Sequence, residues 1–149
     1  MHVGDICHRD VAVIGRRESL LEAARRMRES HVGSLVVIDP KEGEPVPVGI
    51  LTDRDILVQV LTAGVSPQSV AAEDIMASHL VTAREEDGVF ETIQQMQRKG
   101  IRRIPVVNSK QSLTGILTLD DLLEYFAKEL KNLSGISSLE RERETTSHP

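Results

Sequence analysis

Aromatic side chains are scarce in this chain of 149 residues: tryptophan is absent, and Phe, Trp and Tyr together make up 2%. The three aromatics, Phe90, Tyr125 and Phe126, all fall in segments with a helical pattern. A surface that stacks single-stranded bases needs exposed aromatic rings. Positive charge is also short, because 18 Lys and Arg face 23 Asp and Glu, for a net charge of −5. Proteins that bind nucleic acid through its phosphates carry a basic face, so we expect no nucleic-acid partner.

Cysteine and long apolar runs are lacking too. The single cysteine, Cys7, excludes an internal disulfide and is typical of a reducing compartment. No apolar run approaches the ~20 residues of a membrane helix, and no signal peptide opens the sequence. We therefore expect a cytoplasmic protein without a membrane partner. The five histidines and Cys7 have no zinc-like spacing, and Cys7 lacks a recognisable base, so we expect neither a metal nor an enzyme.

The chain instead contains an internal repeat. Residues 49–57, Gly-Ile-Leu-Thr-Asp-Arg-Asp-Ile-Leu, return at 115–123 as Gly-Ile-Leu-Thr-Leu-Asp-Asp-Leu-Leu, an offset of 115 − 49 = 66. Upstream, Asp5-Ile6 matches Asp74-Ile75 at an offset of 74 − 5 = 69. The difference of three residues is confined to the segment just before the 49–57 motif. Self-similarity with one localised insertion indicates two copies of one module.

Each copy shows the same order of hydrophobic patterns. A short apolar strand precedes a helix of period 3.6, and two further strands joined by a polar turn precede a second helix. Ser19 and Glu22 predict a capping box at one helix start, and Gly100 predicts a helix end. The expected elements are strand 11–14, a helix after Ser19, strands 34–39 and 46–51 and helix 53–61 in copy one, and strand 80–83, a helix ending at Gly100, strands 103–108 and 113–117 and helix 119–130 in copy two. The fold class is α/β (α+β), with two β-α-β-β-α units whose crossovers are right-handed.

Composition also predicts the boundaries. We assign residues 1–62 to the first unit, 63–73 to a linker, 74–133 to the second unit and 134–149 to a tail. Each unit alone is marginal for a stable core, so the two are expected to pack together. The tail is polar, and its charges alternate at adjacent positions, so we expect it to be disordered. A helix that braces a dimer is the alternative for this tail.

Both copies end in Gly-h-h-Thr-x-x-Asp, where h is a hydrophobic residue, after a hydrophobic strand. Over residues 3–132 the sequence resembles a tandem pair of cystathionine β-synthase (CBS) domains, the Bateman module. The resemblance implies two units related by pseudo-twofold symmetry and packed sheet to sheet, in a disc-shaped homodimer. It also implies a non-catalytic regulatory module that binds an adenosine-containing ligand such as AMP, ADP, ATP, NAD or S-adenosylmethionine and modulates an unidentified partner protein.

The two Thr-x-x-Asp motifs permit two interpretations. Thr52 and Asp55, like Thr118 and Asp121, can form a capping box at a helix start. By resemblance, the acids would instead hold ribose hydroxyls, and the threonines would reach sugar or phosphate beside the exposed amides of the first helical turn. The two roles are compatible, so both remain open.

By resemblance, each acid faces an adenine pocket supplied by the other copy. Aliphatic walls could hold a purine without an aromatic ring, and ordinary core packing is the alternative for each of these residues. The expected walls are Cys7, Ala12, Val32, Gly33 and Ser34 for the Thr118/Asp121 motif, and Met76, Val81, Ile101 and Arg102 for the Thr52/Asp55 motif.

Arg102 and Arg103 distinguish the copies, because copy one has Gly33-Ser34 at these positions. Strand alternation would place one guanidinium on each face of the sheet. By resemblance both arginines contact ligand phosphate, and Arg103 is the expected phosphate partner in the roomier cleft beside Gly33. Surface ion pairs are the alternative for both arginines.

The leading hypothesis for the chain is an adenine-nucleotide sensor with no cofactor, and the other hypothesis is a structural dimerisation module without a ligand.

Overall fold

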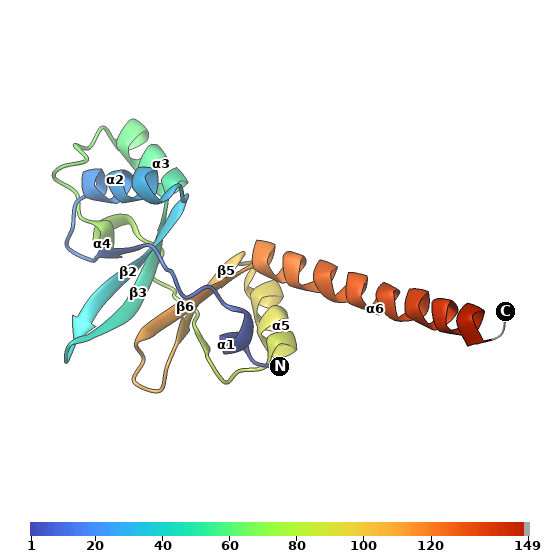
Figure 1. The fold of residues 1–149 in the computed structure, drawn as a ribbon. Helices are drawn as coiled ribbons and strands as arrows, with labels where there is room; N and C mark the ends of the chain where they lie inside the picture. Colours follow the sequence, from blue (N-terminus) through green and yellow to red (C-terminus); the bar gives the residue numbers. More distant parts are fainter. Residues whose placement is uncertain (148–149) are drawn as a thin grey trace. The chain divides into compact units, whose positions relative to one another are not determined.

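Residues 1–147 are described by a computed structural model, in which two three-stranded sheets are flanked by helices (Figure 1). The chain divides into Met1–Leu117 and a second part that begins at Thr118. Copy one comprises β1 (Val13–Gly15), α2 (Leu20–Ser30), β2 (Ser34–Lys41), β3 (Glu44–Thr52) and α3 (Asp53–Ala63). Copy two comprises β4 (Ala83–Arg84), α5 (Val89–Lys99), β5 (Arg103–Val107), β6 (Leu113–Thr118) and α6 (Leu119–Ser147). The short helices α1 (Val3–Ile6) and α4 (Ala72–Ile75), which are absent from the predicted elements, precede the two copies. The predicted β-α-β-β-α order and mixed fold class are confirmed.

The two sheets have the same topology. Their strand orders are β1-β2-β3 and β4-β5-β6, with the first two strands parallel in each. A parallel pair needs a crossover connection, which α2 and α5 supply. The middle strands are covered on both faces: Leu35, Val36 and Val37 of β2 are buried, as are residues 104–107 of β5. The continuous apolar runs of the sequence therefore reflect two covered faces.

The helix signals read from the sequence are present in the structure. The Ser19 hydroxyl accepts a hydrogen bond from the amide of Glu22 at 3.2 Å, which caps α2, but the Glu22 carboxylate pairs with Arg25 and Arg26, so only half of the predicted capping box is formed. Gly100 ends α5 with φ 63°, a left-handed conformation that glycine adopts without steric cost. The buried faces of these helices repeat at helical spacing, and their buried residues are Leu20, Ala23 and Met27 in α2 and Val89, Thr92 and Met96 in α5.

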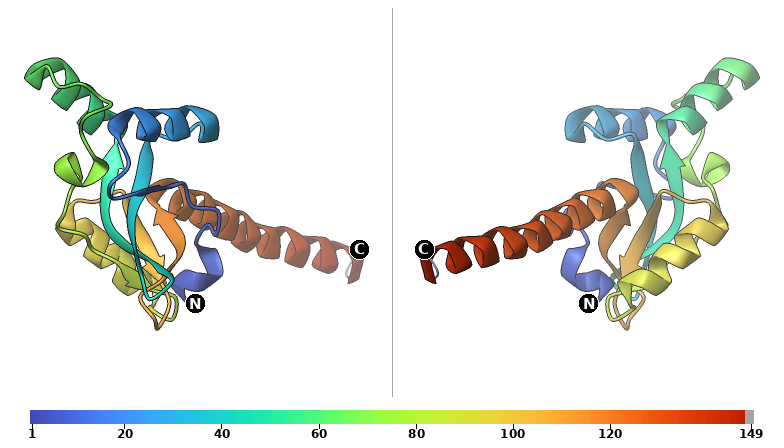
Figure 2. Two further views of the ribbon diagram at one scale, coloured as in Figure 1. Left: turned by 90° about the vertical axis from the view of Figure 1, so that its left-hand side faces the viewer. Right: turned by 90° about the vertical axis from the view of Figure 1, so that its right-hand side faces the viewer.

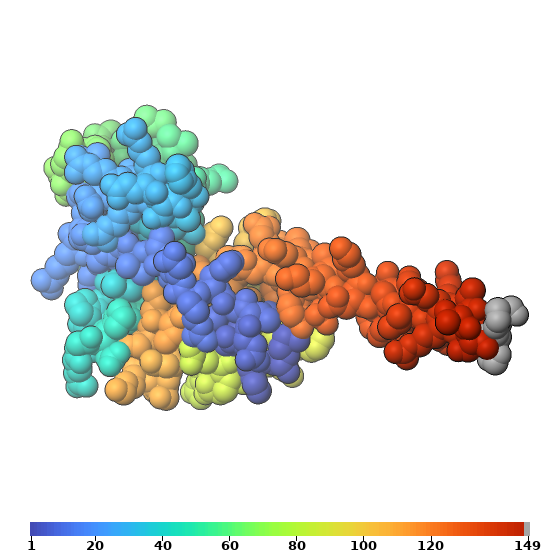
Figure 3. Space-filling view, in the orientation of Figure 1, coloured from blue at the N-terminus to red at the C-terminus, as the bar shows by residue number. Residues whose placement is uncertain are grey.

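The segment before each copy bonds to the other copy. The amide of Val3 donates to Asp87 at 2.8 Å, and the amide of Gly4 donates to Glu85 at 2.9 Å. Figure 3 shows the N-terminal residues, in dark blue, against the yellow-green segment that contains Glu85. Thus α1, although it precedes copy one in the chain, is anchored to copy two.

The reciprocal bonds anchor α4 to copy one. The amide of Ala72 donates to Glu18 at 2.8 Å, and the amide of Glu73 donates to Arg16 at 3.0 Å. These four residues are the equivalents of the α1 set at the repeat offset of 69. The same exchange in both directions is the signature of pseudo-twofold symmetry within Met1–Leu117.

Each exchanged segment crosses the last strand of the other copy at a glycine. Ile50 and Ala77 exchange backbone hydrogen bonds of 3.3 and 3.0 Å beside Gly49. A Cβ atom on Gly49 would lie 2.9 Å from the carbonyl oxygen of Ala77. At Gly115 a Cβ atom would lie 2.8 Å from the carbonyl oxygen of His8. The glycine that begins each repeated motif is therefore required by the close approach of two backbones.

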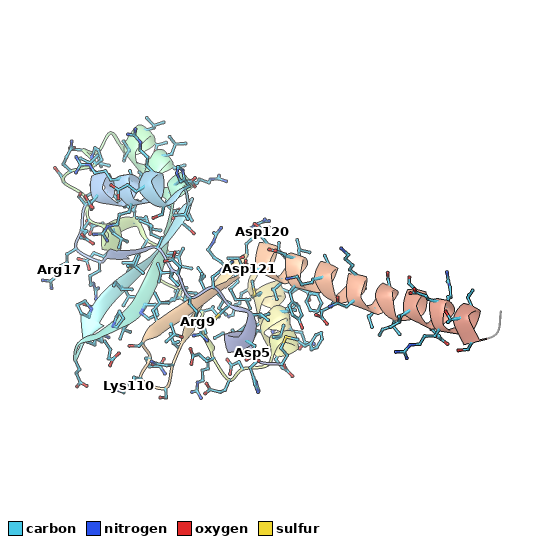
Figure 4. The ribbon with its side chains drawn as sticks, viewed as in Figure 1. Asp5, Arg9, Arg17, Lys110, Asp120 and Asp121 are labelled. Atoms are coloured by element: carbon cyan, nitrogen blue, oxygen red, sulfur yellow. The ribbon has the colours of Figure 1, made fainter. Side chains whose placement is uncertain are left out.

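Charged side chains also hold the segment that contains α1 against copy two. The Arg9 guanidinium is paired with the Glu85 carboxylate and donates to the carbonyl of Gly4 at 2.8 Å (Figure 4). The hydrogen bond from Arg9 holds the pKa of the Glu85 carboxyl below its ordinary value of 4.5. The ion pair therefore joins the segment that follows α1 to the residue that follows β4, and it stabilises the ionised carboxylate.

This pair predicts a pH dependence of stability. As the pH falls below 4.5, the unfolded chain binds a proton at Glu85 before the folded chain does. The stabilisation is therefore full above pH 4.5 and is lost as the pH falls through the lowered pKa of the folded state. We expect Glu85→Gln to lose less stability than the unsubstituted chain between pH 7 and about pH 3 in urea unfolding. Glu86→Gln, at a neighbouring exposed carboxylate, is the control, and equal pH dependence in all three proteins would contradict the prediction.

The second part of the chain is dominated by α6, one continuous helix from Leu119 to Ser147 (Figure 2). The prediction of a helix ending near Leu130 and a disordered tail over 134–149 is wrong for residues 134–147, and residues 148–149 lie outside the described part. Within the tail, residues 139–144 are all Leu, Glu or Arg, which have high helix propensity, and the helix continues through the weaker Ser, Thr and Gly residues on either side. None of the helices in residues 1–147 is long and apolar enough to cross a membrane.

Candidate functional site

The first Thr-x-x-Asp motif lies where β3 passes into α3. Thr52 is the N-cap residue, and its hydroxyl accepts a hydrogen bond from the amide of Asp55 at 3.1 Å. In return, Oδ2 of Asp55 accepts a hydrogen bond from the amide of Thr52 at 3.0 Å. Both side chains are half-buried. The capping interpretation is thus confirmed for this motif.

The cap leaves part of each side chain available. Within Met1–Leu117, Oδ1 of Asp55 accepts no hydrogen bond, and the Thr52 hydroxyl acts only as an acceptor. An ionised carboxylate has about four lone-pair sites, and a hydroxyl can also donate. A ligand hydroxyl can therefore bind here without breaking the cap.

The first-turn amides of α3 are less available than the sequence suggested. The amide of Asp53 donates to the carbonyl of Gly33 at 2.9 Å, and the amide of Arg54 donates to Oδ1 of Asp53 at 2.8 Å. With the Asp55 amide bonded to Thr52, all three are occupied. The expectation that exposed amides await a phosphate at this helix start is therefore wrong, because strand pairing and side-chain capping use them.

The expected purine wall beside Thr52 comes from copy two. Met76 follows α4, and the Ile50–Ala77 bridge places it beside β3, since a Cβ atom on Gly49 would lie 2.5 Å from its sulfur. Ile101 follows the end of α5, and its amide donates to Met96 at 3.0 Å. Met76, Val81 and Ile101 are all half-buried. They are therefore not fully enclosed, although Met76 packs against the core cluster of copy one, as the core-packing alternative expected.

The two arginines differ in position. Arg103 begins β5 and is half-buried, whereas Arg102 precedes the strand and is exposed. Arg102 lies one residue before the strand, so the structure assigns only Arg103 to the sheet, and the expectation of one guanidinium on each face stays a prediction. Within Met1–Leu117 neither guanidinium forms an ion pair, although Arg9, Arg16 and Arg26 do. The ion-pair alternative is thus not found in that part of the chain.

The corresponding wall in copy one is more open. Ala12 and Ser34 are half-buried, Gly33 is exposed and Val32 is 38% exposed. The carbonyl of Ala12 accepts a hydrogen bond from Val36 at 3.0 Å, which fixes the wall to β2. Cys7, the remaining expected member, is half-buried.

The second Thr-x-x-Asp motif forms its own capping box. The Thr118 hydroxyl accepts from the amide of Asp121 at 3.1 Å, and Oδ2 of Asp121 accepts from the amide of Thr118 at 3.3 Å. Figure 4 shows Asp120 and Asp121 in the first turn of α6. The two motifs therefore have the same local geometry.

Two cavities in Met1–Leu117 involve residues outside the predicted site. A cavity of about 310 Å³ lies where β3 faces the segment before β4, and a cavity of about 650 Å³ lies between the two hairpin turns. Leu80 and Thr82, the two neighbours of Val81, line the first cavity. Alternate residues of an extended segment face opposite sides, so this alternation could have indicated Leu80 and Thr82 from the sequence. The first is lined by Val46, Pro47, Val48, Ser78, Leu80, Thr82, Val107 and Gln111, and the second by Lys41, Glu42, Glu44, Val46, Lys110 and Gln111.

In residues 1–147 no three His, Cys, Asp or Glu side chains are grouped to hold a metal.

A family model described as "CBS domain" matches residues 3–61 and 72–128. The chain belongs to the CBS domain family. It is a tandem CBS pair, a type of module that is generally regulatory.

Similar proteins support this assignment. The uncharacterised protein MK0525 of Methanopyrus kandleri is 38% identical over 122 residues, which are 82% of this chain and 61% of that protein. The chain therefore spans about three fifths of that relative. The crystal structure of Hypoxic Response Protein I with two coordinated zinc ions has a TM-score of 0.72 and 29% identity, covering 84% of this chain and 98% of that one. The CBS domain pair of protein MJ0100, in complex with 5-methylthioadenosine and S-adenosyl-L-methionine, has a TM-score of 0.71 and 26% identity, covering 87% and 98%.

Proposed function

We propose that this CBS pair is a non-catalytic regulatory module that binds an adenosine-containing ligand. The observation that carries the proposal is the spare hydrogen-bonding capacity of Asp55 and Thr52 at the end of β3, the strand against which Met76 of copy two lies at Gly49. One carboxylate can accept both hydroxyls of a ribose, and the aliphatic wall can cover a purine face. The complex of MJ0100 with two adenosine compounds supports this ligand class.

Two ligand surfaces are proposed. The Thr52 site consists of Thr52, Asp55, Met76, Val81 and Ile101. The Gly33 wall consists of Ala12, Val32, Gly33 and Ser34. Arg102 and Arg103 would neutralise ligand phosphates, because a guanidinium group can bind a phosphate through two parallel hydrogen bonds. Thr118 and Asp121 are proposed as the second ligand-binding motif by their equivalence in the repeat.

Titration calorimetry tests the proposal directly. We expect AMP, ADP, ATP, NAD, S-adenosylmethionine or 5-methylthioadenosine to bind with heat and to raise the melting temperature, since a ligand of the folded state stabilises it. Guanine and cytosine nucleotides are the controls. A folded protein that binds none of the six adenosine compounds would remove the sensing function.

The same titration distinguishes the second candidate, a structural dimerisation module. That candidate is favoured by the completed capping boxes, which need no ligand. In either case we propose a cytoplasmic homodimer. In the sensing case, ligand binding would change the surface offered to an unidentified partner protein.

A further inference from the structure

The last part of α6 lies outside the match to the CBS family. The family model ends at residue 128, whereas α6 continues to Ser147. Every side chain from Ala127 to Ser147 is exposed. A helix in water is marginally stable by itself, and most helices in proteins depend on the packing of one apolar face. This stretch also contains Gly135, four serines and two threonines, which are weaker helix formers. The end of α6 therefore requires a surface against which to pack.

One face of α6 carries exposed leucines at the spacing of a helix pair. Leu123, Leu130 and Leu133 are 60%, 66% and 61% exposed. The first two are seven positions apart and the last two are three positions apart, which matches the inward positions of a coiled-coil heptad. At about 100° of rotation per residue, the three lie within about 80° of one another around the helix axis. Further along α6, the same positions are occupied by Glu140 and Glu144. The face is therefore apolar in its first part and acidic near its end.

Charge favours a second copy of α6 as the partner, in the antiparallel direction. Parallel pairing would place Glu140 opposite Glu140 of the partner subunit, and like charges at an interface are unfavourable. Antiparallel pairing about a twofold axis between Leu130 and Leu133 separates the two acidic ends. Leu130 then lies opposite Leu133 of the partner subunit, and the symmetry repeats this contact in reverse. The same pairing brings Asp120, in the first turn of α6, close to Arg141 of the partner subunit, which carries the opposite charge.

We propose that α6 pairs antiparallel with α6 of a second copy, so that the helix beyond the CBS match joins two chains. This inference deepens the homodimer of the proposed function and does not depend on ligand binding. About the axis between Leu130 and Leu133, residues 119–144 of the two helices overlap. The overlap is about 39 Å long, because a helix rises about 1.5 Å per residue. The contact therefore extends over most of α6.

The first measurement is sedimentation equilibrium of the full chain. Leu133→Glu introduces a carboxylate into the proposed contact twice, once from each copy. We expect this variant to raise the dissociation constant of the dimer at least about tenfold, which is typical for the loss of a central contact of an interface. Leu139→Glu is the matched control, because it makes the same change at a leucine that is 50% exposed and lies about 120° from Leu133 around the helix axis. The control should change the dissociation constant less than about twofold.

Disulfide cross-linking tests the direction of the pair. Leu123→Cys and Glu140→Cys are prepared separately, each together with Cys7→Ser, and are then mixed and treated with oxidised glutathione. Antiparallel pairing places residue 123 of one copy opposite residue 140 of the other, so we expect the mixed disulfide to form. The two copies of residue 123 would lie about 25 Å apart along the helix axis, far beyond the Cα separation of about 4.4–6.8 Å that a disulfide spans. Neither variant alone should therefore cross-link.

The outcomes separate this inference from the proposed function. A monomeric unsubstituted chain would overturn the pairing, as would a Leu133→Glu protein that dimerises as tightly as the Leu139→Glu protein. Cross-linking of either cysteine variant with itself would overturn the antiparallel direction. A dimer in which the mixed disulfide does not form would overturn the pairing of α6 and leave the homodimer in place. A failure of AMP to bind in calorimetry would contradict the sensing function alone, because none of these results requires a ligand.

Discussion

Replacing Asp55 by alanine is expected to weaken AMP binding at the Thr52 site by about 10- to 100-fold. A hydrogen bond to a charged group contributes about 1.5–3 kcal/mol, and each 1.4 kcal/mol is a factor of ten in affinity. The half-buried position of the carboxylate reduces its screening by water, so the effect should not vanish at physiological salt. Calorimetric titration of the two proteins with AMP measures it.

Two further variants separate ligand binding from helix capping. Asp55→Asn keeps an oxygen that can accept from the Thr52 amide, so we expect stability near that of the unsubstituted chain with most of the affinity loss retained. Asp5→Ala removes a carboxylate in the equivalent capping position of α1, where it accepts from the amide of His2 at 2.9 Å. We expect this control to bind AMP normally. An Asp55→Ala protein that binds AMP as tightly as Asp5→Ala would show that Asp55 only caps α3.

Most of the fold could be predicted from the sequence because the same order of hydrophobic patterns occurs twice, once in each copy. The patterns around Ser19 and Gly100 each mark a helix end through a local hydrogen bond or a local φ angle, and both are present in the structure. The Thr52 and Thr118 capping boxes are local in the same sense, since donor and acceptor are three residues apart. Features that depend on neighbours in sequence were therefore predictable.

Features that depend on distant contacts were not. The bond between the Gly33 carbonyl and the Asp53 amide exists because β2 pairs with β3 in one register, and it removes the amide that a phosphate could have used. The anchoring of α1 to copy two depends on backbone bonds between residues more than eighty positions apart, as from Gly4 to Glu85. No side-chain pattern encodes these bonds, because they join backbone groups that every residue carries.

The long helix α6 shows a different limit. Its apolar residues recur every third position from Leu130 to Leu139 and are at least 50% exposed. An amphipathic face is the usual sequence signal of a helix, and the adjacent alternating charges at 140–144 do not form one. The run 139–144, made of Leu, Glu and Arg, has high intrinsic helix propensity and was the better guide for this segment.

Replacing Gly49 by alanine is expected to destabilise the folded chain strongly for so small a change. The added methyl would lie 2.5 Å from the sulfur of Met76, which can rotate away, and 2.9 Å from the carbonyl oxygen of Ala77, which cannot move without breaking the Ile50–Ala77 bridge. Overpacking of this kind costs about 1–3 kcal/mol, and 1 kcal/mol lowers the melting temperature by about 2–4 °C in a protein of this size. The melting temperature should therefore be several degrees lower than that of the unsubstituted chain.

Gly135→Ala is the matched control, because it makes the same chemical change where no atom lies within 4 Å. Glycine inside a helix is about 0.5–1 kcal/mol less stable than alanine, so this variant should stabilise α6. The two substitutions are thus expected to shift unfolding in opposite directions, which unfolding curves in urea at pH 7 can measure. If Gly49→Ala were as stable as Gly135→Ala, the two backbones could not approach as closely at Gly49 as the structure describes. The occurrence of glycine at the start of both repeated motifs would then require a different structural explanation.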